Sequence, residues 1–167
     1  MRECDICAHR LTSSIDEPCM SDINFFVPGI PATQGSKKWV GGHRIVDTCK
    51  SLPQWRKDVA TIARLHAPKK PIPKNYNVYM KLHFYLPRPK SHYGTGRNAG
   101  KLKKGAPAVP RGKDLTKMLR AVEDSLSGII FEDDDQVSLQ LNSKNYADDC
   151  GSGVSVSIQY YQNQCQP

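Results

Sequence analysis

Apolar and polar residues alternate most regularly in residues 77–86, where every second side chain is apolar. A period of two predicts a strand that buries one face. Residues 22–28 are apolar and aromatic, and residues 136–146 and 153–161 are rich in strand-forming residues, so each predicts another strand. Two shorter runs, 37–40 and 43–46, lie on either side of a Gly-Gly pair and predict a tight hairpin.

Two other stretches follow the period of a helix. In the first, Trp55, Val59, Ile62 and His66 recur at spacings of four, three and four residues, which places them on one helical face. Just upstream of this face, Ser51 and Pro53 are suited to a helix start. The second stretch covers residues 115–127 and ends before a glycine. Its apolar face consists of Leu115, Met118, Leu119, Val122 and Leu126.

The order of elements is strand, hairpin, helix, strand, long loop, helix, strand, strand, which predicts one α+β domain. We expect this domain to span residues 21–161, with an N-terminal appendage at 1–20 and a C-terminal tail at 162–167. No apolar run approaches the 18 residues of a membrane span, and the charged start MRECDICAHR does not resemble a signal peptide. We therefore expect a cytoplasmic protein without a membrane partner.

Charge is distributed unevenly along the chain. The formal net charge is +8, but residues 37–113 carry 19 basic and 2 acidic residues, whereas residues 114–167 carry 3 basic and 9 acidic residues. A basic middle followed by an acidic cluster indicates a surface for a polyanion beside a cation site. Within the basic part, residues 87–113 contain eight Lys and Arg residues and no acid.

The acidic residues that are candidates for a metal site are Asp114, at the start of the second helix, and the run 132–135, which follows that helix. Packing of this helix on the sheet could bring the two together. Gathered carboxylates repel one another unless a cation neutralises them, and Mg²⁺ prefers such oxygen ligands. The alternative is structural: Asp114 caps the helix and residues 132–135 form a solvated turn.

The segment DLTKMLRAVEDSLSGIIFEDDDQV, residues 114–137, resembles the signature of RusA-type Holliday junction resolvases. The runs at 29–38, 87–98 and 144–148 are similar to the phage-borne branch of that family. The resemblance implies a mixed β-sheet with two helices on it, and a homodimer that cuts four-way DNA junctions in recombination and repair. It further implies dependence on Mg²⁺, with Mn²⁺ as a substitute, no small-molecule cofactor, and the cytoplasm of a bacterial host if a phage encodes the chain.

The family's site residues carry over by position. Asp114 matches the first nuclease-site aspartate, and Asp133 and Asp134 match the acidic pair that precedes a glutamine. The resemblance implies that these three bind the metal, and that Arg120, at the family's basic helix position, steadies phosphate charge. Lys117 stands where other members have asparagine.

One residue departs from the family pattern, because Thr116 replaces the second aspartate of its D-x-D motif. A neutral hydroxyl is a weak ligand for Mg²⁺. Asp133, Asp135 or Glu132 could take its role. Otherwise the chain is a weakened or inactive homologue that binds branched DNA, and a general nucleic-acid-binding domain is the third alternative.

The cations of the long loop and the predicted hairpin are candidates for contacts with DNA phosphates, which would be salt-sensitive and independent of sequence. The alternative is a flexible, solvated loop beside a charged edge strand. The candidate DNA-binding residues are Lys37, Lys38, Arg88, Lys90, His92, Arg97, Lys101, Lys103, Lys104, Lys113 and Lys117.

Cys4, Cys7, His9 and Cys19 supply three thiols and an imidazole near the N-terminus. This ligand set is sufficient for a tetrahedral Zn²⁺ site. Its spacing matches no familiar zinc module, so the alternative is an unstructured tail with free thiols, as a reducing compartment favours.

Overall fold

The computed structural model describes residues 21–35, 37–39, 42, 45–47, 49–148 and 151–162. Four strands form the main sheet in the order β1 (Ser21–Pro28), β6 (Gly153–Gln162), β4 (Tyr76–Leu86) and β5 (Val137–Tyr146). β6 is antiparallel to both of its neighbours, whereas β4 and β5 are parallel. The predicted strands and the mixed sheet are therefore confirmed.

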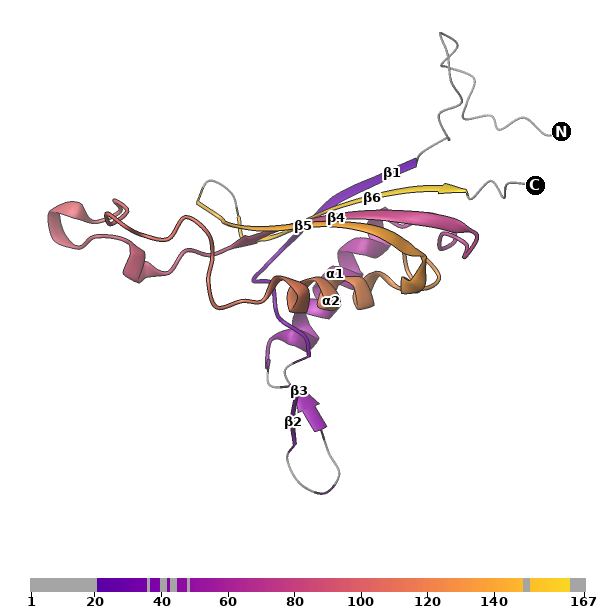
Figure 1. Cartoon of the computed structure of the whole chain (residues 1–167), viewed down its shortest axis with the longest axis horizontal. Coiled ribbons are helices and arrows are strands. Elements are labelled where there is room, and N and C mark those ends of the chain that lie inside the picture. The colour runs from indigo at the N-terminus through magenta and orange to yellow at the C-terminus, as the bar shows by residue number, and fades with distance from the viewer. Residues whose placement is uncertain are drawn as a thin grey trace, which may run out of the picture.

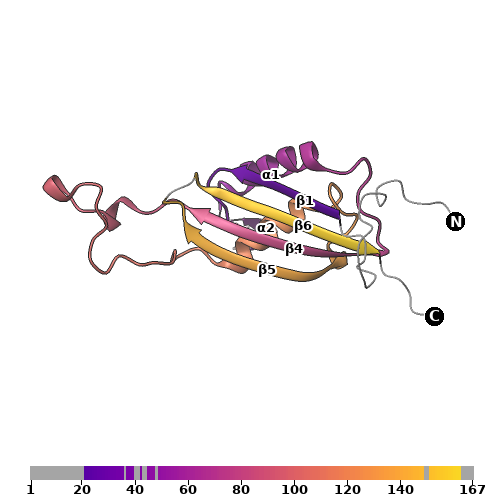
Figure 2. The same cartoon turned by 90° about the horizontal axis from the view of Figure 1, so that it is seen from above.

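Two helices, α1 (Leu52–His66) and α2 (Leu115–Leu126), lie on one face of this sheet (Figures 1 and 2). The alternation in β4 turns its apolar side chains toward the helices, and all five are buried. Apolar residues of β1, β6 and both helices complete one core. The predicted single α+β domain is confirmed, because each amphipathic element buries its apolar side in the same place.

Helix α1 begins after Ser51, as predicted, although the serine side chain makes no capping hydrogen bond. Trp55 and Val59 are buried, in agreement with the predicted face. His66 differs from the other residues of this face. It is exposed at the last position of the helix, where its ring stacks on Phe25 at a centroid distance of 5.2 Å.

The predicted hairpin consists of β2 (Lys37–Trp39) and β3 (Ile45–Asp47), which pair in an antiparallel register. At Gly42, between them, the backbone has a φ of 55°, a left-handed conformation that glycine adopts without strain. Figure 1 shows the hairpin standing away from the sheet on the side of the helices.

Residues 87–113, which we call the basic arm, project beyond the end of the main sheet in both views (Figures 1 and 2). The arm contains two short 3₁₀ turns, η1 (Lys90–His92) and η2 (Gly96–Asn98), and a backbone bridge between Tyr93 and Leu102. Neither α-helix in the described part of the chain is long and apolar enough to span a membrane.

Candidate functional site

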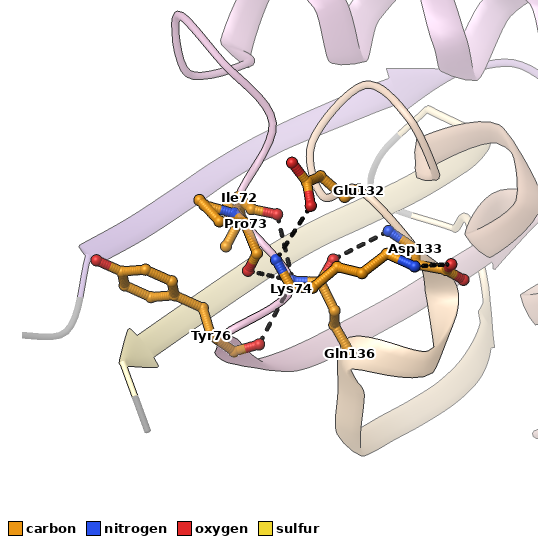
Figure 3. A network of polar contacts seen from close by, with 7 residues as sticks. All are labelled: Ile72, Pro73, Lys74, Tyr76, Glu132, Asp133 and Gln136. Carbon is orange, nitrogen blue, oxygen red and sulfur yellow. Dashed lines mark hydrogen bonds and ion pairs between the residues drawn. The ribbon is translucent and has the colours of Figure 1, made fainter. Parts of the chain in front are cut away.

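The acidic turn, residues 132–135, follows α2 and leads into β5. Asp133 is the N-cap of the 3₁₀ helix η3 (Asp134–Gln136). The Gln136 side chain reaches back and accepts a 2.9 Å hydrogen bond from the Asp133 backbone N–H. Its amide donates to the carbonyl oxygens of Pro73 and Ile72, at 2.7 and 3.2 Å (Figure 3). The buried glutamine of the motif thus fixes the turn against the segment that precedes β4.

Lys74 supplies the positive charge of this turn. Its ammonium group lies 2.7 Å from Asp133, and its backbone N–H donates to Glu132 at 3.2 Å (Figure 3). The hydrogen bond with Lys74 lowers the pKa of Asp133, and the same bond raises the pKa of Lys74. Asp133 is therefore ionised and partly neutralised, while the carboxylates of Asp134 and Asp135 are exposed on the next turn.

Asp114 caps the N-terminus of α2, as the structural alternative predicted. Its carboxylate accepts hydrogen bonds from the backbone N–H groups of Thr116 and Lys117, at 3.0 and 3.4 Å. The side chain is nevertheless exposed, and one carboxylate oxygen makes both contacts. Close by, Lys144 near the end of β5 donates to the Lys113 carbonyl at 2.6 Å. Asp114 therefore lies beside the C-terminal end of β5.

The structure does not bring Asp114 and the acidic turn together within one chain. They flank a helix of 12 residues, which spans about 18 Å at 1.5 Å per residue. Asp114 lies near the end of β5, whereas Asp134 directly precedes its start. Among the residues that the structure describes, no group of three Asp, Glu, His or Cys side chains is placed to hold a metal ion.

A profile of the family described as endodeoxyribonuclease RusA matches residues 28–159. This range includes both ends of α2, the acidic turn and the basic arm. The chain belongs to the RusA endodeoxyribonuclease family. A relative from Bacillus subtilis strain 168, named uncharacterized protein YqaN, is 29% identical over 133 residues, which cover 78% of this chain and 92% of the relative.

RusA-family members are endonucleases that resolve Holliday junctions. The structure also explains two of the other sequence runs that resemble the family, 87–98 and 144–148. Arg88, from the run at 87–98, forms hydrogen bonds of 2.7 and 2.5 Å with Asp148, from the run at 144–148. The Arg88 guanidinium also lies over the ring of Tyr146, 3.9 Å from its centroid. Two motifs that are 60 residues apart in sequence are therefore two halves of one contact.

Glu123 is a neighbour of the acidic turn that the sequence analysis missed. It is half-buried on α2, where Gln140 of β5 donates to its carboxylate. Burial raises its pKa, and the nearby negative charge of Asp134 raises it further. The sequence did contain a signal for Glu123, because the residue directly follows Val122 of the apolar helix face and so lies at the margin of that face.

The remaining nuclease-site and DNA-binding candidates are dispersed. Arg120 is exposed on α2, with its guanidinium beside Gly35, and it lowers the pKa of Glu123 slightly against the effect of burial. Lys113 donates to the carbonyl of Pro31, and burial lowers its pKa. Lys117 lies in the first turn of α2. Lys113 and Lys117 therefore lie near Asp114 at the start of α2, whereas Arg120 lies in the middle of the helix.

Most cations of the basic arm are exposed, as the DNA-binding prediction requires. The exposed ones are Lys90, Arg97, Lys101, Lys103, Lys104 and Arg111. His92 is half-buried, and its ring meets Tyr146 edge-on. The side chains of Lys37 and Lys38 lie outside the described part of the structure, as do Cys4, Cys7, His9 and Cys19, so these predictions remain predictions.

Proposed function

We propose that the protein resolves four-way DNA junctions by hydrolysing phosphodiester bonds with Mg²⁺ or Mn²⁺, as a homodimer. One observation carries this proposal: Asp114 and Asp134 are exposed carboxylates at the two ends of α2, and an acid-free basic arm leads directly into Asp114. Carboxylate oxygens suit a hard divalent cation. Exposed cations suit DNA phosphates, whatever the sequence.

One chain alone does not fit the metal, because Asp114 and Asp134 are separated by the length of α2. A second copy supplies the missing half if the two β5 strands pair antiparallel. Among the strands that the structure describes, β5 lies at an edge of the sheet and pairs with β4 alone. Antiparallel pairing places the end of one β5 beside the start of the other. Asp114 then approaches Asp134 of the partner subunit, and a two-fold axis produces this arrangement twice.

The surface of β5 supports such pairing. Leu139 and Leu141 are 54% and 57% exposed, although β5 has Val137 packed on the core at its start. Both leucines are in register with Tyr79 and Lys81 of β4, on the sheet face opposite the helices. A free edge with exposed leucines is a surface that pairing would cover.

In the paired arrangement, each candidate site residue has a distinct proposed role. Asp114 and Asp134 of the partner subunit are proposed as metal ligands, and Asp133 holds Lys74 beside them. Held by these carboxylates, Mg²⁺ would supply Lewis-acid chemistry, namely polarisation of the scissile phosphate and a more acidic water molecule. Arg120 adds positive charge on the same helix. The basic arm holds the phosphates outside the scissile position.

The experiment is incubation with a synthetic four-way junction, scoring cleavage and binding together in Mg²⁺ and in EDTA. We expect paired nicks in Mg²⁺, and binding without nicks in EDTA. The variant Asp134→Asn is expected to bind the junction and leave it uncut. Cleavage that persists in EDTA would contradict the metal dependence. Equal affinity for the junction and for a linear duplex of the same length would contradict the choice of substrate.

Thr116 favours a second candidate function, a homologue that binds branched DNA without cutting it. The residue places a neutral hydroxyl beside Asp114 where the family pattern has a carboxylate. Binding depends on the basic surface and not on that carboxylate. Tight, selective junction binding without nicks in either Mg²⁺ or Mn²⁺ would identify this candidate.

A further inference from the structure

The basic arm is a folded projection with its own hydrogen bonds. The Lys103 backbone N–H donates to the His92 carbonyl and that of Gly94 to the Lys101 carbonyl, both at 2.9 Å. The Lys103 side chain also donates to the Ser91 carbonyl at 2.9 Å. These contacts join the outgoing and returning halves of the arm, so its exposed cations occupy defined positions relative to one another.

Arg88 joins this arm to the domain at its base. Its guanidinium forms two hydrogen bonds with Asp148, and a third, of 2.9 Å, with the carbonyl of Pro107 on the returning half of the arm. The side chain is only 7% exposed. One residue therefore connects the end of β4, the returning half of the arm and the segment that follows β5.

Tyr146 completes the base of the arm. Arg88 lies over its ring at 3.9 Å from the centroid, and His92 packs edge-on against it at a centroid distance of 5.6 Å. The outgoing half of the arm thus also rests on β5. A planar guanidinium can form this fork of hydrogen bonds and stack on the ring at the same time, which a lysine ammonium cannot. We call Arg88, His92, Tyr146, Asp148 and Pro107 the bracket.

We propose that Arg88 is a positioning residue, which sets the direction of the basic arm and thereby the preference for branched over linear DNA. This inference rests on the proposed function. A loose arm with the same cations still attracts the phosphates of any duplex, because that attraction requires charge and not direction. Contact with a second duplex of a junction requires the arm to point along one path, and an arm fixed beforehand gives up less conformational entropy on binding.

The test compares Arg88→Gln and Asp148→Asn with a matched control, Arg97→Gln. Asp148→Asn removes the partner of Arg88 and leaves every cation of the arm in place. Arg97→Gln removes an exposed cation near the tip and leaves the bracket intact. The readouts are the dissociation constants for a four-way junction and a linear duplex, and the rate at which trypsin cuts after the arm lysines in the absence of DNA.

We expect both bracket variants to lower the ratio of junction to duplex affinity by about ten-fold, mainly by weakening junction binding. We also expect faster tryptic cleavage within the arm, at a temperature where melting curves show that the domain of each variant is still folded. Arg88→Lys is expected to recover only part of the preference. Arg97→Gln should weaken binding to both DNAs by the same factor, at an unchanged rate of arm cleavage.

An unchanged affinity ratio in both bracket variants would overturn the positioning role. So would an arm that trypsin cuts at the parental rate in both variants, because the bracket would then not hold it. A parent protein that itself shows no preference for junctions would overturn the proposed function, and with it the selectivity role. The proteolysis rates separate these cases, since they report on the bracket without DNA.

Discussion

At the scale of single residues, the acidic turn shows how one family motif combines structure and chemistry. Gln136 is 5% exposed and faces backbone groups on every polar side, whereas Asp134, two residues earlier, is exposed. The glutamine has the geometry of a structural residue, and the exposed aspartate is the one that we propose as a metal ligand. If Asp134 binds a metal ion, the buried glutamine would keep this ligand in position, because it fixes the turn.

We expect Gln136→Leu to lower the free energy of unfolding by about 1–3 kcal/mol, because it leaves buried backbone groups without hydrogen-bond partners. Urea denaturation measures this change. Gln54→Leu is the matched control, since Gln54 is exposed on α1, and we expect a change within about 0.5 kcal/mol. Equal effects of the two substitutions would contradict the role of Gln136.

Glu123 gives a prediction for pH. Its folded-state pKa lies above the ordinary value of 4.5, so the folded protein binds this proton more tightly than the unfolded chain does. Its contribution to stability is therefore present below the unfolded pKa, and is lost as pH rises through the folded pKa. Glu123→Gln removes this loss, so we expect a higher melting temperature than the parent at pH 7.

The Glu123→Gln measurement is a series of melting curves from pH 4 to pH 8 in EDTA, so that no metal ion contributes. Near pH 4 we expect the parent and Glu123→Gln to melt at similar temperatures, with the difference growing toward neutral pH. Asp22→Asn, an exposed carboxylate on β1, serves as control. A variant less stable than the parent at pH 7 would show that the ionised carboxylate is stabilising.

At the scale of elements, most of the candidate functional residues belong to helix α2, with the turn that follows it, or to the basic arm. The N-terminus of α2 presents Asp114 and Thr116, its C-terminal turns present Glu123, and the acidic turn follows. The arm carries six exposed Lys and Arg residues and no acid. The N-terminus of α2 is exposed, and so are most cations of the arm. Single substitutions at these positions therefore test the chemistry of each element with little effect on the core.

We expect Thr116→Asp to raise junction cleavage about ten-fold in millimolar Mg²⁺, since it adds an anionic ligand beside Asp114. An acidic residue in the first turn of α2 also interacts favourably with the helix dipole, so folding is preserved. Thr116→Asn is the matched control, because it has the shape of aspartate without its charge. Equal rates for the two variants would mean that another acid already serves as ligand.

Lys101 and Lys104 are exposed on the arm, whereas the Lys103 side chain is bonded to the Ser91 carbonyl. We expect alanine at positions 101 and 104 to reduce the slope of log affinity against log salt by about 0.9 for each DNA phosphate that is no longer neutralised. Filter binding on the four-way junction at several salt concentrations measures the slope. Lys70→Ala, an exposed lysine outside the arm, is expected to leave it unchanged.

At the scale of the whole molecule, the two halves of the proposed nuclease site, Asp114 and Asp134, lie at opposite ends of α2. The same helix that places Asp114 at the surface holds it away from Asp134. The proposed two-fold pair of chains would turn this separation into two sites, one for each strand that a paired cut requires. Of the two edge strands that the structure describes, β1 and β5, we propose β5 for this pairing, because its two ends lie beside Asp114 and the acidic turn.

Mixing two inactive variants tests this arrangement. In a heterodimer of Asp114→Asn and Asp134→Asn, one site contains both substitutions and the other contains neither. Random exchange of subunits should therefore restore about a quarter of the parental sites. The measurement is single-strand nicking of a junction after the variants are unfolded and refolded together. Each variant alone should remain inactive, and a mixture that also remains inactive would place both acids in the same chain.

Much of the fold could be predicted from the sequence, because the relevant signals are local. The period of two in β4 and the helical spacing in α1 and α2 depend on residues a few positions apart, and their burial follows from which side is apolar. The hairpin and the end of α2 follow in the same way from glycines. The acids and cations of the candidate site could also be identified from the sequence, since charge and family motif are properties of the chain itself.

Only the tertiary structure determined which groups the candidate site residues contact. Arg88, a DNA-binding candidate by charge, forms a buried contact with Asp148, which is 60 residues away and becomes its neighbour only when β4 and β5 pair. Glu123 acquires its raised pKa from burial against β5 and from Asp134. Asp114 and Asp134 lie apart because a helix advances by a constant rise per residue, and the distance between its ends is set by its length, whatever charges the two ends carry.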